Sequence, residues 1–176
     1  MRRSLFRLVA ICACLVGFGV SMRYAEARDP QTGERTGDSK RSESQVLFVC
    51  EHGNVKSLMA ASYFNQLAEQ RGLPYRAISR GKAPDSTTVP APIAEGLRAD
   101  GIDVSGFHPS AVKPTDVTAS QRVVTIGTTL PPEAQTTGGA RIEQWNDVPP
   151  TSQGFDGTRD SIKSHVRKLI EELANR

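Results

Sequence analysis

The segment Cys50–Ser57 (CEHGNVKS) combines a thiol, a basic side chain and a hydroxyl at spacings that suit nucleophilic chemistry on an anion. It follows an apolar run and precedes a helical pattern, so its backbone N–H groups can converge on one concavity that binds an oxyanion. A Cys50 thiol at the edge of that concavity faces the positive end of the helix and Lys56, and both favour the thiolate. Ser57 could donate its hydroxyl to the sulfur. These residues predict an oxyanion-binding loop with Cys50 as its nucleophile.

The segments around this loop alternate between strand and helix patterns. Apolar, β-branched runs at 45–50 and 122–127 predict strands buried on both faces, and shorter runs at 75–79 and 141–145 predict two more. Apolar residues at three- and four-residue spacing predict a helix over about 56–71, one that contains Ile93 and Leu97, and a C-terminal helix. The alternation predicts a three-layer α/β sandwich, with a four-stranded parallel sheet and helices on both faces. Such sheets bind ligands beyond the carboxyl ends of their strands, which is where Cys50 would lie.

The stretch VLFVCEHGNVKSLMAAS resembles the phosphate loop of the low-molecular-weight protein tyrosine phosphatase and arsenate reductase superfamily. It has a strand that ends in Cys, five residues, a basic residue, Ser, and a helix rich in Met and Ala. The later segments GLRADGIDVSGFHPSAV, RVVTIG and IEQWNDVPP are similar to the arsenate reductase branch in order and spacing. The resemblance extends from Gln45 to the C-terminus, and it implies the fold that the alternation predicts.

The resemblance implies a phosphate-monoester hydrolase that works through a phosphocysteine on Cys50, assisted by Lys56 and Ser57. It implies that the oxyanion is bound by the loop residues Glu51, His52, Gly53, Asn54, Val55 and Lys56. It also implies a general acid, for which Asp147, in the segment Trp145–Pro150, is the nearest match. A carboxylic acid there would protonate the leaving oxygen and then activate water. The other interpretation of Asp147 is an ordinary turn residue.

The loop departs from the family pattern in two ways, and Glu51 is in addition an unusual residue for an anion site. Lys56 stands where the family has Arg, and an ammonium is a point charge where a guanidinium is a two-pronged donor. The family's Asn lies three residues after the Cys, but Gly53 occupies that position and Asn54 follows it. Glu51 brings a negative charge beside an anion site, where it should oppose ligand binding.

Two other functions remain open from the sequence. The first is an arsenate reductase that uses an external thiol, because no second Cys adjoins the loop and no resolving Cys follows it. The second is a non-catalytic module that binds an oxyanion or a partner. The missing cysteines favour the hydrolase over the reductase, whereas Lys56 and the shifted Asn54 favour the binding module over both enzymes.

The first 27 residues have the three parts of a secretory signal peptide: a basic start, an apolar stretch over 8–20, and Ala25-Glu26-Ala27 before the expected cleavage. An uncleaved anchor is less favoured, because a bilayer needs about 20 apolar residues. A lipid on Cys12 or Cys14 is less favoured too, because the apolar stretch continues past both. We therefore expect an exported protein, periplasmic or secreted, with no stable membrane span after cleavage. Cys50 would then be its only thiol.

Composition and charge limit the remaining possibilities. The segment 28–44 is rich in charge, Gly and Ser, so it predicts a disordered linker before one folded domain over 45–176. A net charge of +3, with no basic run alternating with aromatics, argues against nucleic acid as a partner. His108 and His165 have no partner at metal-ligand spacing, so we expect no metal and no other cofactor. The expected partners are a phosphorylated or oxyanion substrate and, for the reductase, an external thiol.

Overall fold

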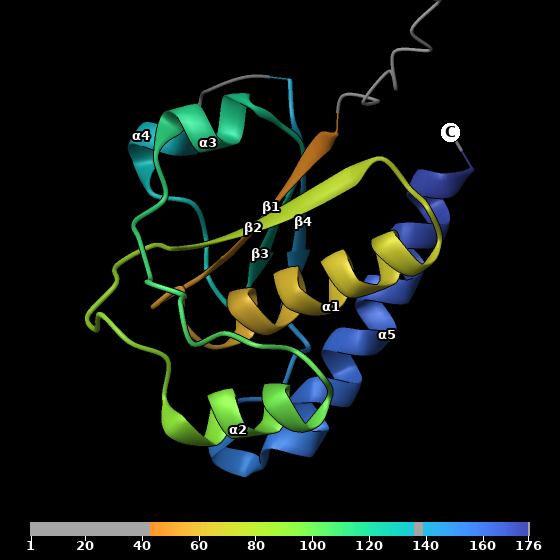
Figure 1. Ribbon diagram of the computed structural model, residues 1–176. Coiled ribbons are helices and arrows are strands. Elements are labelled where there is room, and N and C mark those ends of the chain that lie inside the picture. The colour runs from red at the N-terminus through yellow and green to blue at the C-terminus, as the bar shows by residue number, and fades with distance from the viewer. Residues whose placement is uncertain (1–42, 136–138, 176) are drawn as a thin grey trace, which may run out of the picture. The chain divides into compact units, whose positions relative to one another are not determined.

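Four strands form one sheet in which every neighbouring pair is parallel (Figure 1). In chain order they are β1 (Ser44–Cys50), β2 (Tyr75–Gly81), β3 (Ser120–Ile126) and β4 (Arg141–Trp145). The order across the sheet is β2-β1-β3-β4, so β1 is central and its side chains from Val46 to Cys50 are buried. That position accounts for its continuous apolar run. The computed structural model thus confirms the four-stranded parallel sheet.

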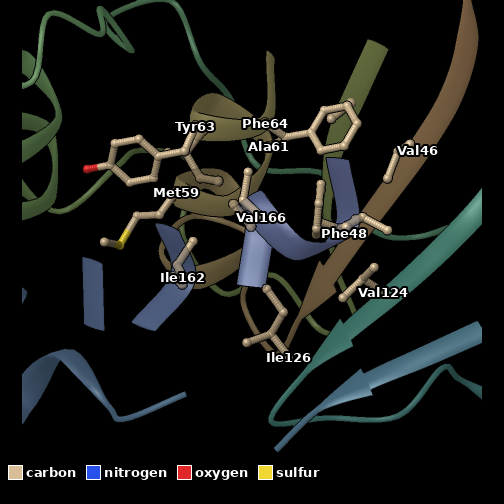
Figure 2. Close-up of a cluster of buried hydrophobic side chains, with 14 of the residues drawn as sticks. Val46, Phe48, Met59, Ala61, Tyr63, Phe64, Val124, Ile126, Ile162 and Val166 are labelled. Carbon is tan, nitrogen blue, oxygen red and sulfur yellow. The ribbon is translucent and has the colours of Figure 1, made fainter. Parts of the chain in front are cut away.

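Successive side chains of β1 alternate between two helical layers. Val46, Phe48 and Cys50 face the layer formed by α1 (Lys56–Gln70) and α5 (Phe155–Ala174). Figure 2 shows part of this core, where Phe48 lies among residues of both helices. Leu47 and Val49 face the opposite layer, which contains the short helices α3 (Pro114–Thr118) and α4 (Pro132–Gln135). This arrangement confirms the expected three-layer sandwich.

The two short helices are the part of the fold that the sequence patterns do not predict. Each begins at a proline, whose fixed φ suits the first helical position. At five and four residues they are too short to show a helical period. A third helix, α2 (Ala91–Ala99), was expected around Ile93 and Leu97, both of which are buried. It lies beside the start of α5 (Figure 1), where the Phe155 ring fills the space next to Gly96.

A polar cluster joins α1, the end of α2 and α5. The Tyr63 hydroxyl donates to Asp100 Oδ2 at 2.7 Å, and Lys163 Nζ donates to the same oxygen at 2.9 Å. Burial, and then the bond to Asp100, raise the pKa of Tyr63 well above its ordinary value. Tyr63 therefore stays a neutral donor, and the cluster fixes α1, whose first turn follows the Cys50 loop.

The structure describes residues 43–135 and 139–175, which belong to one compact unit, Ser39–Arg176. The expected signal peptide and residues 28–42 of the expected linker lie outside them. Ser44, expected at the end of the linker, is instead the first residue of β1, because it continues the parallel pairing with Tyr75. None of the helices in these described residues is long and apolar enough to cross a membrane.

Candidate active site

The segment 51–55 connects the end of β1 to the start of α1 and folds tightly against the end of β2. Gly53 has φ of +79°, which favours glycine, and a Cβ on it would lie 2.5 Å from the backbone nitrogen of Gly81. A Cβ on Gly81 would in turn lie 2.7 Å from the backbone carbon and oxygen of His52. The sequence therefore needs glycine at both positions, since only glycine lets these two backbones meet.

This close approach directs the loop backbone toward the sulfur of Cys50. The amide of Gly53 donates to Cys50 Sγ at 3.3 Å, and Ser57 Oγ, in the first turn of α1, lies 3.0 Å from the same sulfur. The Cys50 residue is only 6% exposed, yet it lines a cavity. Two donors at one sulfur suit a thiolate, which accepts hydrogen bonds and donates none. The structure therefore brings Cys50 and Ser57 together as the sequence predicts.

Ser79, on β2, completes this network. Its hydroxyl lies 2.9 Å from Ser57 Oγ and 3.0 Å from the carbonyl oxygen of Gly53. A hydroxyl has one proton, so when Ser57 donates to the sulfur, its oxygen can accept the proton of Ser79. Ser79 thereby orients Ser57. Ser79 was not predicted from the sequence, where the available signal was a Ser within the expected strand at 75–79; in the structure its side chain is buried.

The remaining loop amides make the concavity suitable for an anion. Within the described part of the chain, the amides of Glu51, His52, Asn54 and Val55 donate to no protein acceptor. The first backbone N–H groups of α1 have no acceptor within the helix, and they carry the positive end of the helix dipole. Backbone donors around a buried sulfur form the kind of nest that binds phosphate or a similar oxyanion.

Lys56 closes one side of a cavity of about 240 Å³ above the sulfur. Its Nζ donates to the carbonyl oxygen of Val148 at 3.1 Å, so α1 is tied to the segment that follows β4. An ammonium has three protons, which leaves two for an anion in the cavity. The cavity is lined by Cys50, Glu51, His52, Val55, Lys56, Ile126, Gly127, Pro150, Thr151 and Ser152.

The other expected loop residues hold the loop in place through their side chains. Asn54 is buried, and its amide nitrogen donates to the carbonyl oxygen of Thr88 at 3.0 Å. His52 Nδ1 lies 3.1 Å from a carboxylate oxygen of Asp85. Both bonds fasten the loop to the segment after β2. Asn54 is not among the residues that line the cavity.

Asp147 is not among the residues that line this cavity. Its carboxylate oxygens lie 3.0 and 3.1 Å from Nε2 of His165 on α5, and 72% of its side chain is exposed. The His165 ring stacks on Trp145 with a centroid distance of 4.6 Å. The structure thus keeps Asp147 in the segment that reaches Lys56 through Val148, but it does not bring the carboxylate to Cys50. Its role as general acid stays a prediction.

Among residues 43–135 and 139–175, no group of three His, Cys, Asp or Glu is placed to hold a metal ion. The groups that the structure places around the cavity are the Cys50 thiol, the Ser57 hydroxyl, the backbone donors of the loop and Lys56. That set can bind a tetrahedral oxyanion and present a nucleophilic sulfur to it.

The sequence matches the family model of the low molecular weight phosphotyrosine protein phosphatases over residues 45–176. This match supports a phosphatase-like activity. A comparison with curated proteins finds no match.

The fold is similar to that of several solved structures. The YfkJ protein of Bacillus subtilis superposes with a TM-score of 0.68 at 23% identity, over 76% of this chain and 96% of that one. A low molecular weight protein tyrosine phosphatase of T. tengcongensis superposes with a TM-score of 0.63 at 21% identity, over 74% of this chain and 99% of that one. The thioredoxin-dependent arsenate reductase of Corynebacterium glutamicum superposes with a TM-score of 0.63 at 21% identity, over 76% of this chain and 63% of that one. At these identities the similarities show the fold alone.

We predict that Gly81→Ala weakens the binding of phosphate at Cys50, because the new methyl group displaces the loop backbone at His52. Losing one hydrogen bond to a charged group costs about 1.5–3 kcal/mol, so the phosphate concentration that protects Cys50 from alkylation should rise on the order of tenfold. Gly106→Ala is the matched control, because its methyl group would enter open space. Equal protection of both variants would show that the contact with β2 does not shape the loop.

Proposed function

The chain belongs to the low molecular weight phosphotyrosine protein phosphatase family, and on that premise we propose that it hydrolyses phosphate monoesters through a phosphocysteine intermediate on Cys50. One observation carries the proposal: Cys50 Sγ lies within hydrogen-bonding distance of the Gly53 amide and of Ser57 Oγ, and Cys50 lines the same cavity as Lys56. Nucleophile, donors and cation thus converge where a phosphoryl group would bind.

In the first step, the Cys50 thiolate attacks phosphorus, the S–P bond forms and the bond from phosphorus to the leaving oxygen breaks. The loop amides and the Lys56 ammonium stabilise the charge on the equatorial oxygens. The electron pair of the broken bond stays on the leaving oxygen, which takes up a proton. For a phenolate of low basicity that proton can come from water, so Asp147 is not required in this case.

In the second step, water attacks phosphorus, the S–P bond breaks and its electron pair returns to sulfur as thiolate. Inorganic phosphate leaves, and the water proton passes to a base. Ser57 assists in this step, because its donated hydrogen bond stabilises the sulfur as a leaving group. Ser79 supports this step when its one proton points to Ser57 Oγ and not to the carbonyl oxygen of Gly53, because the proton of Ser57 then stays directed at the sulfur.

Arsenate reduction is the second candidate, since arsenate has the same shape and charge as phosphate. Attack by the Cys50 thiolate would form an S–As bond and break one As–O bond, whose oxygen leaves as water after protonation, and an external thiol would then attack the sulfur and break the S–As bond. That step releases arsenite, in which arsenic is reduced by two electrons, and leaves a mixed disulfide on Cys50. Within the described residues Cys50 is the one free cysteine, so the second thiol must come from outside them. This requirement ranks the hydrolase first.

The turnover of an aryl phosphate and of arsenate plus thiol, measured with wild type and Cys50→Ser, tests the proposal. We expect wild type to release phosphate from 4-nitrophenyl phosphate. The rate of Cys50→Ser should be lower by a factor of at least about 10³, because a hydroxyl is a far weaker nucleophile at neutral pH. Turnover of arsenate alone would favour the reductase. Tight oxyanion binding without turnover of either would establish the binding module.

We predict that Lys56→Arg raises phosphatase turnover. A guanidinium can hold two equatorial oxygens where an ammonium holds one, and a single oxyanion donor is worth about 10²–10³ in rate. A gain of about tenfold in kcat is therefore expected. Lys168→Arg on the exposed face of α5 is the matched control and should change nothing. An unchanged or lower kcat for Lys56→Arg would show that charge geometry at this position does not limit the rate.

A further inference from the structure

Glu51, the residue after Cys50, is exposed and lines the cavity to which Cys50 and Lys56 also contribute. Its Oε2 accepts a hydrogen bond from the hydroxyl of Thr128 at 2.8 Å. Thr128 follows the end of β3, so the carboxylate is fixed between the ends of two neighbouring strands. In the described part of the chain no cationic side chain pairs with Glu51. Its negative charge is therefore available to a ligand.

The charges around the cavity do not favour a simple phosphate dianion. Thiolate and Glu51 are both negative, and Lys56 is the one lysine or arginine that lines the cavity. Part of the hydrogen-bonding capacity of Lys56 is already used by the Val148 carbonyl. The other ionisable group of the lining, His52, faces the carboxylate of Asp85. A bound dianion would thus meet the negative charge of Glu51, and Lys56 is the one lysine or arginine of the lining that can offset the repulsion.

We propose that the site selects phosphate monoesters whose leaving group carries an ammonium or similar cationic group, and that Glu51 binds this cation. The inference rests on the proposed function for its reaction, but it concerns recognition. A cation a few bonds from the phosphoryl group supplies the charge that the loop lacks. Thr128 makes the carboxylate a preorganised partner, because its hydroxyl fixes the carboxylate before the ligand arrives. Glu51 is thus a specificity-determining residue.

Protection of Cys50 from iodoacetamide by two alkyl phosphates tests the inference without requiring turnover. Phosphoethanolamine carries an ammonium group, whereas ethyl phosphate has the same phosphoryl group without it. The measured quantity is the ratio of the two half-protecting concentrations, each referred to the unprotected rate of the same variant. That ratio cancels any effect of a substitution on the reactivity of the thiol. The variants are wild type, Glu51→Gln and Thr128→Val, with Glu171→Gln on α5 as the control that removes an exposed carboxylate.

We expect wild type and Glu171→Gln to prefer phosphoethanolamine by about tenfold, the scale of one partly screened charge pair. In Glu51→Gln the preference should fall to about twofold or less, and in Thr128→Val it should be intermediate, since the charge remains but is no longer fixed. A preference that persists in Glu51→Gln, an absence of preference in wild type, or an absence of protection by either compound would overturn the inference.

The outcome for the proposed function is read separately, from phosphate release by the same preparations. A preference that depends on Glu51, without any release of phosphate, would remove the hydrolase and leave the recognition by Glu51 in place. Phosphate release that depends on Cys50, with equal protection by both compounds, would support the hydrolase and remove the recognition by Glu51.

Discussion

The site depends on one close contact between two backbones. Gly53 of the loop and Gly81 at the end of β2 meet at a distance that excludes a Cβ on either residue. Without that contact the Gly53 amide would not point at Cys50 Sγ, and Ser79, which precedes Gly81 on β2, would not reach Ser57. The parallel pairing of β1 with β2 sets this geometry, since it aligns Cys50 with Gly81. The sheet therefore positions Cys50, the donors at its sulfur and the bend of the loop together.

Local patterns were sufficient to predict the elements that carry the nucleophile. β1 and α1 have continuous signals, an apolar run and a helical period, and the residues between them are adjacent in sequence. The positions of Ser79, Gly81 and Thr128 could not be predicted in this way, because each acts on the loop across the sheet and strand pairing alone brings it there. The placement of Asp147 could not be predicted either. Its partner His165 lies 18 residues later in the sequence, on α5, and nothing in the local sequence signals that pair.

The charges of the loop separate this chain from a simple phosphate binder. Lys56 replaces a planar donor with a point charge and is partly engaged by Val148, while Glu51 adds a negative charge at the same cavity. Each change alone would weaken the binding of a dianion. Taken together, they are consistent with a ligand that brings its own positive charge, which gives the unusual Glu51 a physical role beside Cys50.

The direct test of the account is the detection of the covalent intermediate. Wild-type protein is mixed with an aryl phosphate, quenched rapidly and digested, and the peptide that contains Cys50 is examined for the mass of one added phosphoryl group. The account predicts this label on Cys50 during turnover, its loss as inorganic phosphate is released, and its absence when Cys50 is replaced by Ala. Release of phosphate at the wild-type rate with Cys50 unlabelled, or undiminished release by Cys50→Ala, would contradict it.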